Sequence, residues 1–317
     1  MENHFDVIVI GGGPAGLTAG IYLSRAKLNT LILNEGTAGG QLVLTHEVAN
    51  YPGFESISGY ELARNMKSQA QNFGCKIKSN IKITSLDLKD DIKKVTVNDK
   101  EVFTSHVVIL ALGGRSRTIG APGEDKFKGK GISYFATCDG DFFQDKEIIV
   151  VGGGNSALEE AVSLTKYASK VTVVHQFDHF QAFEHHVKEA KENSKINFIM
   201  ESKITEFIGT EKLSSVKIQN QRTGKISEMP INGVFIFIGY VPNTENLEGI
   251  VNLNKWKEII VDGNLMTNVT GVYAAGDCIP KKYRQITTAV SDGTVAALSA
   301  AEFINNLKKQ DEHLVVN

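Results

Sequence analysis

Three glycines near the N-terminus have the spacing of a phosphate-binding loop. They are Gly11, Gly13 and Gly16, and an apolar run over residues 5–10 comes directly before them. In such a loop the first glycine allows a tight turn, the second lets the backbone approach a pyrophosphate, and the third lets helix and strand pack closely. The free N–H groups of the following helix then bind the phosphates. The spacing therefore predicts a dinucleotide site.

The same pattern recurs in the middle of the chain. Gly152, Gly154 and Ala157 follow a second apolar run, residues 147–151, and open a segment with helical periodicity. This repetition predicts a second nucleotide site. Its candidate residues are Gly152, Gly154, Asn155, Ser156, Ala157 and His175.

A dinucleotide site also needs a hydrogen-bonding side chain for the ribose hydroxyls. That side chain comes about twenty residues after the glycines, at the end of the next strand. Asn34 and Glu35 occupy this corner. The pattern favours an acid there, but an Asn amide can also bond a hydroxyl, so both are candidates.

The elements that must position these residues form two β-α-β units. A short apolar run closed by glycines is typical of a buried parallel strand, and alternating polar and apolar residues suit antiparallel strands. On these grounds the sequence predicts strands at 5–10, 28–33, 107–112, 147–151, 171–174 and 233–238. Helices are predicted at 14–26, from the second glycine loop to about residue 166, and at 286–307. Small antiparallel sheets are predicted within 81–104 and 203–230.

Length and composition narrow the function classes. The 317 residues suffice for about two domains, and the net charge of −2 offers no basic surface for nucleic acid or anionic membrane. Three scattered cysteines indicate a reducing compartment, and no segment approaches the ~20 apolar residues that span a bilayer. We expect a cytoplasmic protein with neither nucleic-acid nor membrane partners.

The order of the motifs resembles that of the low-molecular-weight thioredoxin reductases over nearly the whole chain. The matching segments are Gly11–Gly16, Gly39–Leu42, Val48–Phe54, Ala121–Glu124, Ala136–Gly140, Gly152–Ala157, Gly239–Thr244, Ala275–Asp277 and Arg284–Gln285.

This resemblance implies an α/β fold of two Rossmann-like three-layer nucleotide-binding domains, each with a small antiparallel sheet. The second domain is inserted into the first. Residues 1–115 and 247–317 would form the FAD-binding domain, and residues 116–246 the pyridine-nucleotide-binding-like domain. It also implies a homodimer.

The resemblance further implies roles for individual residues. The first glycine loop would hold the FAD pyrophosphate, Asp277 would bond the ribityl or phosphate region, and the ribose acid aligns better with Asn34 than with Glu35. Gln41, Asn50 and Gln285 would line the flavin. The candidate FAD-binding residues are Gly11, Gly13, Pro14, Ala15, Gly16, Asn34, Glu35, Gly40, Gln41, Leu42, Asn50, Gly113, Gly276, Asp277, Arg284, Gln285 and Ile286.

One departure from the family concerns its redox disulfide. Family members carry a Cys-x-x-Cys beside the flavin, whose two sulfurs cycle between dithiol and disulfide. Here Phe135 stands in the place of the first cysteine, whereas Cys138 is present and Asp139 follows it in the position of the proton donor. The family route of thioredoxin reduction is therefore closed. Cys138 and Asp139 remain the candidate catalytic residues. An equal alternative is that Cys138 is a small buried residue inherited from an ancestor and has no catalytic role.

A second departure concerns the nucleotide. Family members bind the 2′-phosphate of NADPH with arginines that follow the next strand after the second glycine loop. Such guanidinium–phosphate contacts are strong and bidentate. Residues 175–181 here contain no arginine. Preference for NADPH should be lost, which leaves NADH or no nicotinamide. Four histidines lie within residues 175–186, but a solvated loop accounts for them better than a metal site, so no metal is expected.

Three functions stay open. The first is an FAD oxidoreductase that passes electrons from NADH, or from a small redox protein, to an acceptor directly at the flavin. Relatives without the cysteine pair include ferredoxin–NAD(P) reductases; the partner would be a ferredoxin, a flavodoxin or a thioredoxin-like protein. The second is a thiol/disulfide oxidoreductase that uses Cys138 alone. The third is a non-catalytic FAD-bound redox sensor or scaffold.

Overall fold

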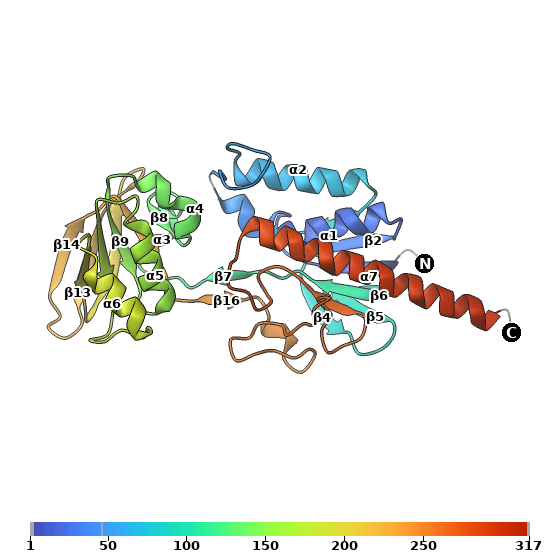
Figure 1. Ribbon diagram of the computed structural model, residues 1–317. Coiled ribbons are helices and arrows are strands. Elements are labelled where there is room, and N and C mark those ends of the chain that lie inside the picture. Colours follow the sequence, from blue (N-terminus) through green and yellow to red (C-terminus); the bar gives the residue numbers. More distant parts are fainter. Residues whose placement is uncertain (1–2, 46, 316–317) are drawn as a thin grey trace. The chain divides into compact units, whose positions relative to one another are not determined.

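Two compact units make up the protein. The computed structural model describes residues 3–45 and 47–315, without the side chains of residues 137, 138 and 311–315. Unit 1 contains Met1–Arg115 and Val241–Asn317, and unit 2 contains Ser116–Tyr240. The chain crosses between them at two short strands, β7 (Gly114–Ser116) and β16 (Tyr240–Pro242), which pair with each other (Figure 1). The second crossing comes earlier in the chain than the predicted boundary at residue 246.

A seven-stranded sheet forms the centre of unit 1, in the order β3-β2-β1-β6-β5-β4 with β17 beside β6. β1, β2, β3, β6 and β17 are parallel, whereas β4, β5 and the first half of β6 are antiparallel. The long strand β6 thus joins the predicted antiparallel strands to the parallel sheet. The bounds are β1 (His4–Ile10), β2 (Thr30–Asn34), β3 (Lys76–Ser79), β4 (Ile83–Asp87), β5 (Lys93–Val97), β6 (Glu101–Leu110) and β17 (Val272–Ala274).

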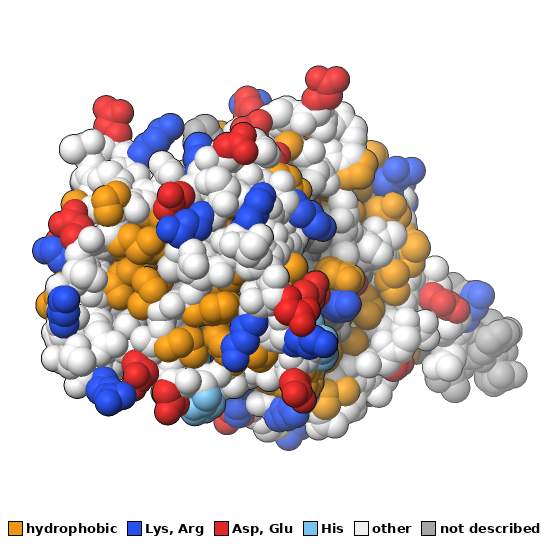
Figure 2. Space-filling model, turned by 60° about the vertical axis from the view of Figure 1, so that its left-hand side comes forward, with side chains coloured by type: hydrophobic (Ala, Val, Ile, Leu, Met, Phe, Trp, Pro, Cys, Tyr) orange, Lys and Arg blue, Asp and Glu red, His pale blue; other side chains and the backbone are white. Residues whose placement is uncertain are grey.

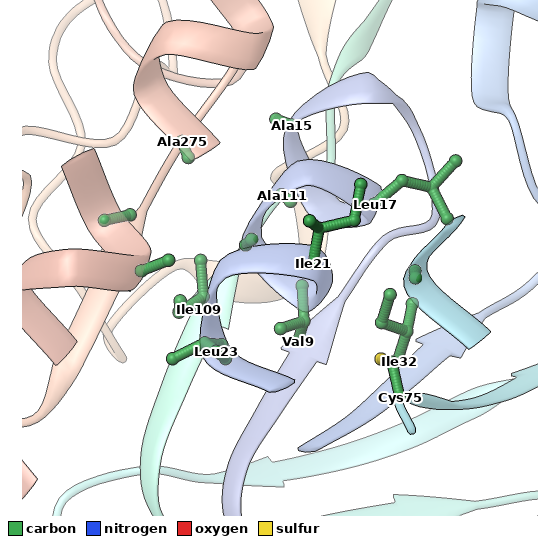
Figure 3. Packing of buried hydrophobic residues seen from close by; sticks show 14 of the residues in the cluster. Val9, Ala15, Leu17, Ile21, Leu23, Ile32, Cys75, Ile109, Ala111 and Ala275 are labelled. Atoms are coloured by element: carbon green, nitrogen blue, oxygen red, sulfur yellow. The ribbon is translucent and has the colours of Figure 1, made fainter. Parts of the chain in front are cut away.

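Successive residues of a strand point to opposite faces of its sheet, and in unit 1 both faces are buried. Val7 and Val9 pack with helices α1 (Pro14–Arg25), α2 (Gly59–Asn72) and α7 (Ile286–Val315). Figure 3 shows Val9 on its strand beside Ile21 of α1. Ile8 and Ile10 pack on the other face with β4, β5 and residues 247–279. This burial explains why the strand is apolar throughout.

Unit 2 has three layers of its own. A parallel sheet of order β11-β10-β9-β15-β8 lies at the centre. Residues of α5 (Asn155–Leu164) and α6 (Glu184–Glu192) cover one face, and the antiparallel sheet β12-β13-β14 contributes to the core on the other (Figure 1). The strand bounds are β8 (Ile132–Ser133), β9 (Glu147–Val151), β10 (Lys170–Val174), β11 (Ile196–Ile199), β12 (Ser202–Gly209), β13 (Leu213–Asn220), β14 (Ile226–Pro230) and β15 (Gly233–Ile236).

The predicted elements are present with modest changes at their ends. β6 and β15 end before residues 112 and 238, because the chain turns there toward Gly113 and Gly239, both at positive φ. α7 runs beyond residue 307, to Val315. The remaining short elements are η1 (Gly40–Leu44), α3 (Glu124–Phe127), α4 (Ala136–Asp139), η2 (Gly140–Phe143) and η3 (Glu245–Leu247). In the part of the chain that the structure describes, no helix is both long and apolar enough to cross a membrane.

Candidate functional site

The predicted FAD residues gather at one edge of the unit 1 sheet. β1 ends directly before Gly11, β2 ends at Asn34, and β17 is followed by Gly276 and Asp277. β6 lies between β1 and β17 and leads to Gly113. These strands are parallel neighbours, so their carboxyl ends meet at the same edge, which is where open α/β sheets bind ligands.

The first glycine loop combines two packed glycines with one open glycine. A Cβ at Gly11 would overlap the carbonyl oxygen of Ala111, and one at Gly16 would overlap that of Gly11. A Cβ at Gly13 would meet nothing within 4 Å. Gly13 is also the N-cap of α1 and Pro14 follows it, yet no side chain caps the helix. The first turn therefore keeps backbone N–H groups for an anion.

Asn34, not Glu35, faces the glycine loop. The Asn34 side chain is buried, and its Oδ1 accepts a hydrogen bond from the Gly12 backbone N at 2.8 Å. The exposed Glu35 carboxylate instead accepts from the backbone of β4 at 3.0 Å. The two side chains thus have different surroundings: Asn34 holds the glycine loop through Gly12 and donates from its Nδ2 to the Gly36 carbonyl oxygen, whereas Glu35 faces β4.

A second segment borders the loop. A Cβ at Gly40 would lie 3.1 Å from the Gly13 Cα. Leu42 is buried in the core cluster that also contains residues of α1 and α2, and Gln41 between Gly40 and Leu42 is exposed. The segment is therefore anchored by Leu42, and its neighbouring residues border the space in front of Gly13.

Asp277 supplies an unused hydrogen-bond acceptor. Its Oδ1 is buried and has no hydrogen-bond partner among the described residues. Burial raises the pKa of the Asp277 carboxyl, although the charges of Lys281 and Arg284 act in the opposite direction. A buried acceptor without a donor is costly, and a hydroxyl of a bound ligand would relieve that cost. The backbone N of Gly276 next to it donates to Asp292 at 3.1 Å.

The start of α7 meets the segment around Asn50. Asn50 Nδ2 donates to Gln285 Oε1 at 3.4 Å, and Ile286 begins the helix. Arg284 forms an ion pair with Glu258, a partner that the sequence analysis missed because no local spacing indicates it. An open phosphate cradle, a buried ribose-side amide and an orphaned carboxylate together fit FAD. FAD would supply the redox chemistry, with Gly13, Asn34 and Asp277 among its ligands.

The second glycine loop has the same construction. A Cβ at Gly152 would overlap the carbonyl oxygen of Phe237 and lie 2.9 Å from the Ala157 Cβ, whereas one at Gly154 would find its nearest neighbour, the Gln181 oxygen, at 3.9 Å. Gly154 is the N-cap of α5 and no side chain caps that helix. Asn155, at the first helical position with Ser156 after it, accepts from the Phe183 backbone N at 2.7 Å. This loop also presents open space to an anion.

His175 fixes the segment that follows β10. Its ring is buried against Gly153 and stacks on Phe180 with centroids 5.9 Å apart. Its Nε2 lies 3.1 Å from the His179 carbonyl oxygen. Burial lowers the pKa of His175. Burial therefore favours the neutral form of this ring, and residues 176–181 contain neither Lys nor Arg.

This burial predicts a pH dependence of stability. Because the pKa of His175 is lower in the folded protein than in the unfolded chain, protonation favours unfolding, and the effect begins as pH falls below the unfolded value of about 6.5. We expect His175→Gln to weaken the loss of stability between about pH 7.5 and pH 5.5. Thermal unfolding of both proteins at the two pH values measures this. Parallel losses in the two proteins would contradict it.

Phe135 and Asp139 lie at the two ends of the short helix α4. Phe135 is the N-cap and is 40% exposed. The Ser133 hydroxyl donates to Asp139 Oδ2 at 2.5 Å, and burial nevertheless raises the pKa of this carboxyl. Cys138 lies in the same helix, but its side chain is outside the described residues. Ser133 was not predicted, since nothing in the spacing distinguishes it.

Cys75 and Cys278 are sealed in the core of unit 1. Cys75 packs against α1 on one face of the sheet (Figure 3), and Cys278 packs on the other face. Burial raises the pKa of each thiol to about 11. Disulfides form from thiolates and not from thiols, and the sheet separates the two sulfurs. Neither cysteine therefore takes the place of the family's first redox cysteine, at whose position this chain has Phe135.

The histidines of unit 2 form ring contacts. His185 and His186 have centroids 4.0 Å apart, and Phe183 stacks on His185. Nowhere in the described ranges do three His, Cys, Asp or Glu side chains gather as a metal site would require.

Comparisons with known proteins agree with this geometry. The family profile "Pyridine nucleotide-disulphide oxidoreductase" matches residues 5–293. The chain is 44% identical to the 34.2 kDa protein in rubredoxin operon of Clostridium pasteurianum (96% of this chain, 98% of that protein) and 43% identical to a thioredoxin reductase of Peptoclostridium acidaminophilum (96% and 98%). The crystal structure of thioredoxin reductase from Streptococcus pyogenes superposes with a TM-score of 0.92 at 37% identity (96% and 100%).

These similarities cover both units, and the predicted two-domain Rossmann-like fold is confirmed. Members of this family are FAD-dependent oxidoreductases that use NAD(P)H. The chain therefore belongs to the pyridine nucleotide-disulphide oxidoreductase family and is a thioredoxin-reductase-like flavoprotein.

Proposed function

We propose that this flavoprotein delivers electrons to its acceptor directly at the flavin, without an internal disulfide. The observation that carries the proposal is Phe135 in the place of the first cysteine of the Cys-x-x-Cys motif. A lone Cys138 cannot form the family disulfide, and the other two thiols are buried in unit 1. The activity would be like that of a ferredoxin– or flavodoxin–NAD(P) reductase.

The electron donor in this proposal is NADH or a small redox protein. The open second glycine loop supports a dinucleotide, and the absence of arginine from residues 175–181 disfavours the 2′-phosphate of NADPH. One relative's name places it in a rubredoxin operon, which supports a small redox partner. By analogy with its family, we propose that the protein works as a homodimer.

The chain's own groups bind and orient, and FAD supplies the electron transfer. The amides around Gly13 would hold the pyrophosphate. The Asp277 carboxylate would accept from a ribityl hydroxyl, and Asn50 and Gln285 would contact the ring system. Asp139, whose pKa is raised by burial, is suited to hold and transfer a proton.

An anaerobic titration tests this proposal. NADH should bleach the oxidised-flavin absorbance band, and NADPH should do so far less well. The Cys138→Ser variant should keep at least about half of the wild-type turnover with an artificial acceptor that reacts at the flavin, because no sulfur takes part. Loss of turnover in that variant would reject the proposal. A flavin that no donor reduces would identify the protein as a sensor or scaffold.

A second candidate keeps thiol chemistry. The raised pKa of Asp139 beside Cys138 suits a group that protonates a leaving thiolate. The Cys138 thiolate would then attack the oxidised, disulfide form of an external thiol substrate, forming a mixed disulfide and releasing one thiolate, which takes its proton from Asp139. The same Cys138→Ser variant distinguishes the two candidates, since thiol-dependent turnover would disappear in it.

A further inference from the structure

The segment 254–258 lies beside the segment 280–285 in unit 1. The backbone N of Ile259 donates to the Cys278 carbonyl oxygen at 2.8 Å, and Arg284 pairs with Glu258 across the two segments. They adjoin the candidate flavin residues Asp277 and Gln285, and Asp277 is near enough to Arg284 for their charges to interact. Whatever binds on these segments therefore lies next to the candidate flavin site.

Positive charge dominates the two segments. Their cations are Lys255, Lys257, Lys281, Lys282 and Arg284, and Glu258 is their one acid. Lys257 pairs with Glu248, and Lys281 with Asp292, so these charges are partly offset. Lys255 and Lys282 are exposed. The whole chain has a net charge of −2, so this local excess of cations stands out. Figure 2 shows acidic and basic side chains interspersed over the face that it draws.

Two large aromatic rings are exposed among these charges. Trp256 is 64% exposed and Tyr283 is 62% exposed. The Lys255 ammonium lies 4.2 Å from the Trp256 ring centroid, and that of Lys282 lies 5.1 Å from the Tyr283 ring. Exposed aromatic rings of this size are typical of binding hot spots. We call Lys255, Trp256, Lys282 and Tyr283 the basic aromatic face.

The backbone holds this face in place. Asn254 Oδ1 accepts from the backbone N of Trp256 at 2.9 Å and of Glu258 at 3.0 Å, and the Thr244 hydroxyl donates to the Lys257 carbonyl oxygen at 2.6 Å. These bonds fix the tight turn before any partner arrives. A preorganised surface loses less entropy on binding than a mobile one.

From these features we infer that the basic aromatic face is the docking surface for a small acidic electron-carrier protein. The inference rests on the proposed function, because it assumes a redox partner at the flavin. Opposite charge speeds the encounter, and the aromatic rings supply apolar contact. Interfaces of electron carriers are small, so four side chains form a large share of one.

The test measures binding to the FAD-loaded protein under anaerobic conditions. The probe is an acidic ferredoxin that lacks tryptophan. Trp256 is the only tryptophan of the chain, so its fluorescence reports docking at this face alone. We expect saturable quenching of Trp256 that weakens at least about tenfold as salt rises from roughly 0.05 to 0.5 M.

Charge reversal supplies the matched comparison. We expect Lys255→Glu/Lys282→Glu to raise the Kd at least about tenfold (roughly 1.4 kcal/mol), and Trp256→Ala to do the same by calorimetry. Lys82→Glu/Lys100→Glu changes net charge equally at exposed positions of the β-hairpins in unit 1 and should leave the Kd unchanged.

Equal effects of both double variants, or no saturable quenching, would overturn the inference. So would self-association of the wild type that Lys255→Glu/Lys282→Glu abolishes in sedimentation experiments, since the face would then belong to a second copy. Reduction by NADH and turnover with an artificial acceptor test the proposed function separately. An enzyme active in that assay without ferredoxin binding at this face would retain the proposed function and lose the docking surface.

Discussion

The Gly13→Ala variant should fold like the wild type and lose FAD. Its Cβ would meet no protein atom within 4 Å, so the folded chain accepts it without strain. The same methyl group would occupy the space in which the pyrophosphate approaches the α1 N-terminus. We expect FAD affinity to fall about a hundredfold, roughly 2.7 kcal/mol. Flavin content after purification and the Kd of the reconstituted apoprotein measure the effect.

Gly154→Ala is the matched control for this variant. Its Cβ also has open space, with the Gln181 oxygen at 3.9 Å, but it lies in the second loop. This protein should keep its flavin and lose reduction by NADH. If both variants retain flavin equally well, the first loop does not hold the FAD pyrophosphate and the assignment of unit 1 is wrong.

Introducing two arginines after β10 should restore flavin reduction by NADPH. Gln176 and Gln181 are exposed, and the intervening segment contains neither Lys nor Arg. A charge-assisted hydrogen bond contributes about 1.5–3 kcal/mol, and exposure reduces this. We expect Gln176→Arg/Gln181→Arg to raise the rate constant of flavin reduction by NADPH, per unit concentration, at least about tenfold. Stopped-flow reduction with both nucleotides measures it.

The rate with NADH provides the internal control, because NADH has no 2′-phosphate and should be affected little. Gln176→Lys/Gln181→Lys offers a second comparison, with charge but without the bidentate geometry of guanidinium, and should gain less. Equal gains for NADH and NADPH would show that the arginines act through general attraction of anions. The proposed reason for the loss of NADPH preference would then be wrong.

The two cysteines outside the interrupted Cys-x-x-Cys motif are both buried in unit 1. Cys75 and Cys278 both have thiols with a pKa of about 11 and lie on opposite faces of one sheet. Their burial keeps these two thiols out of redox chemistry, so an acceptor would react with the flavin, as we propose, or with Cys138. This restriction makes the identity of the docking partner the central question about the protein.

The sequence by itself determined the features that depend on local spacing. The glycine spacing predicts a strand, a turn and a helix: Gly11 has a positive φ, and a Cβ at Gly11 or Gly16 would overlap a backbone carbonyl oxygen, whereas Gly13 leaves open space for a ligand. The apolar runs predict buried parallel strands for a similar reason, since alternate side chains enter opposite faces of the core. The sequence also reveals that Phe135 replaces the first cysteine, because the Cys-x-x-Cys motif spans only four consecutive residues.

Only the tertiary structure decided which distant residues meet. The choice of Asn34 over Glu35 as the residue facing the glycine loop follows from hydrogen bonds to Gly12 and to β4. The bond from Asn50 to Gln285, the Arg284–Glu258 ion pair and the orphaned oxygen of Asp277 likewise join or isolate residues far apart in the chain. Such contacts depend on the packing of whole elements against one another, which local spacing and residue preference do not specify.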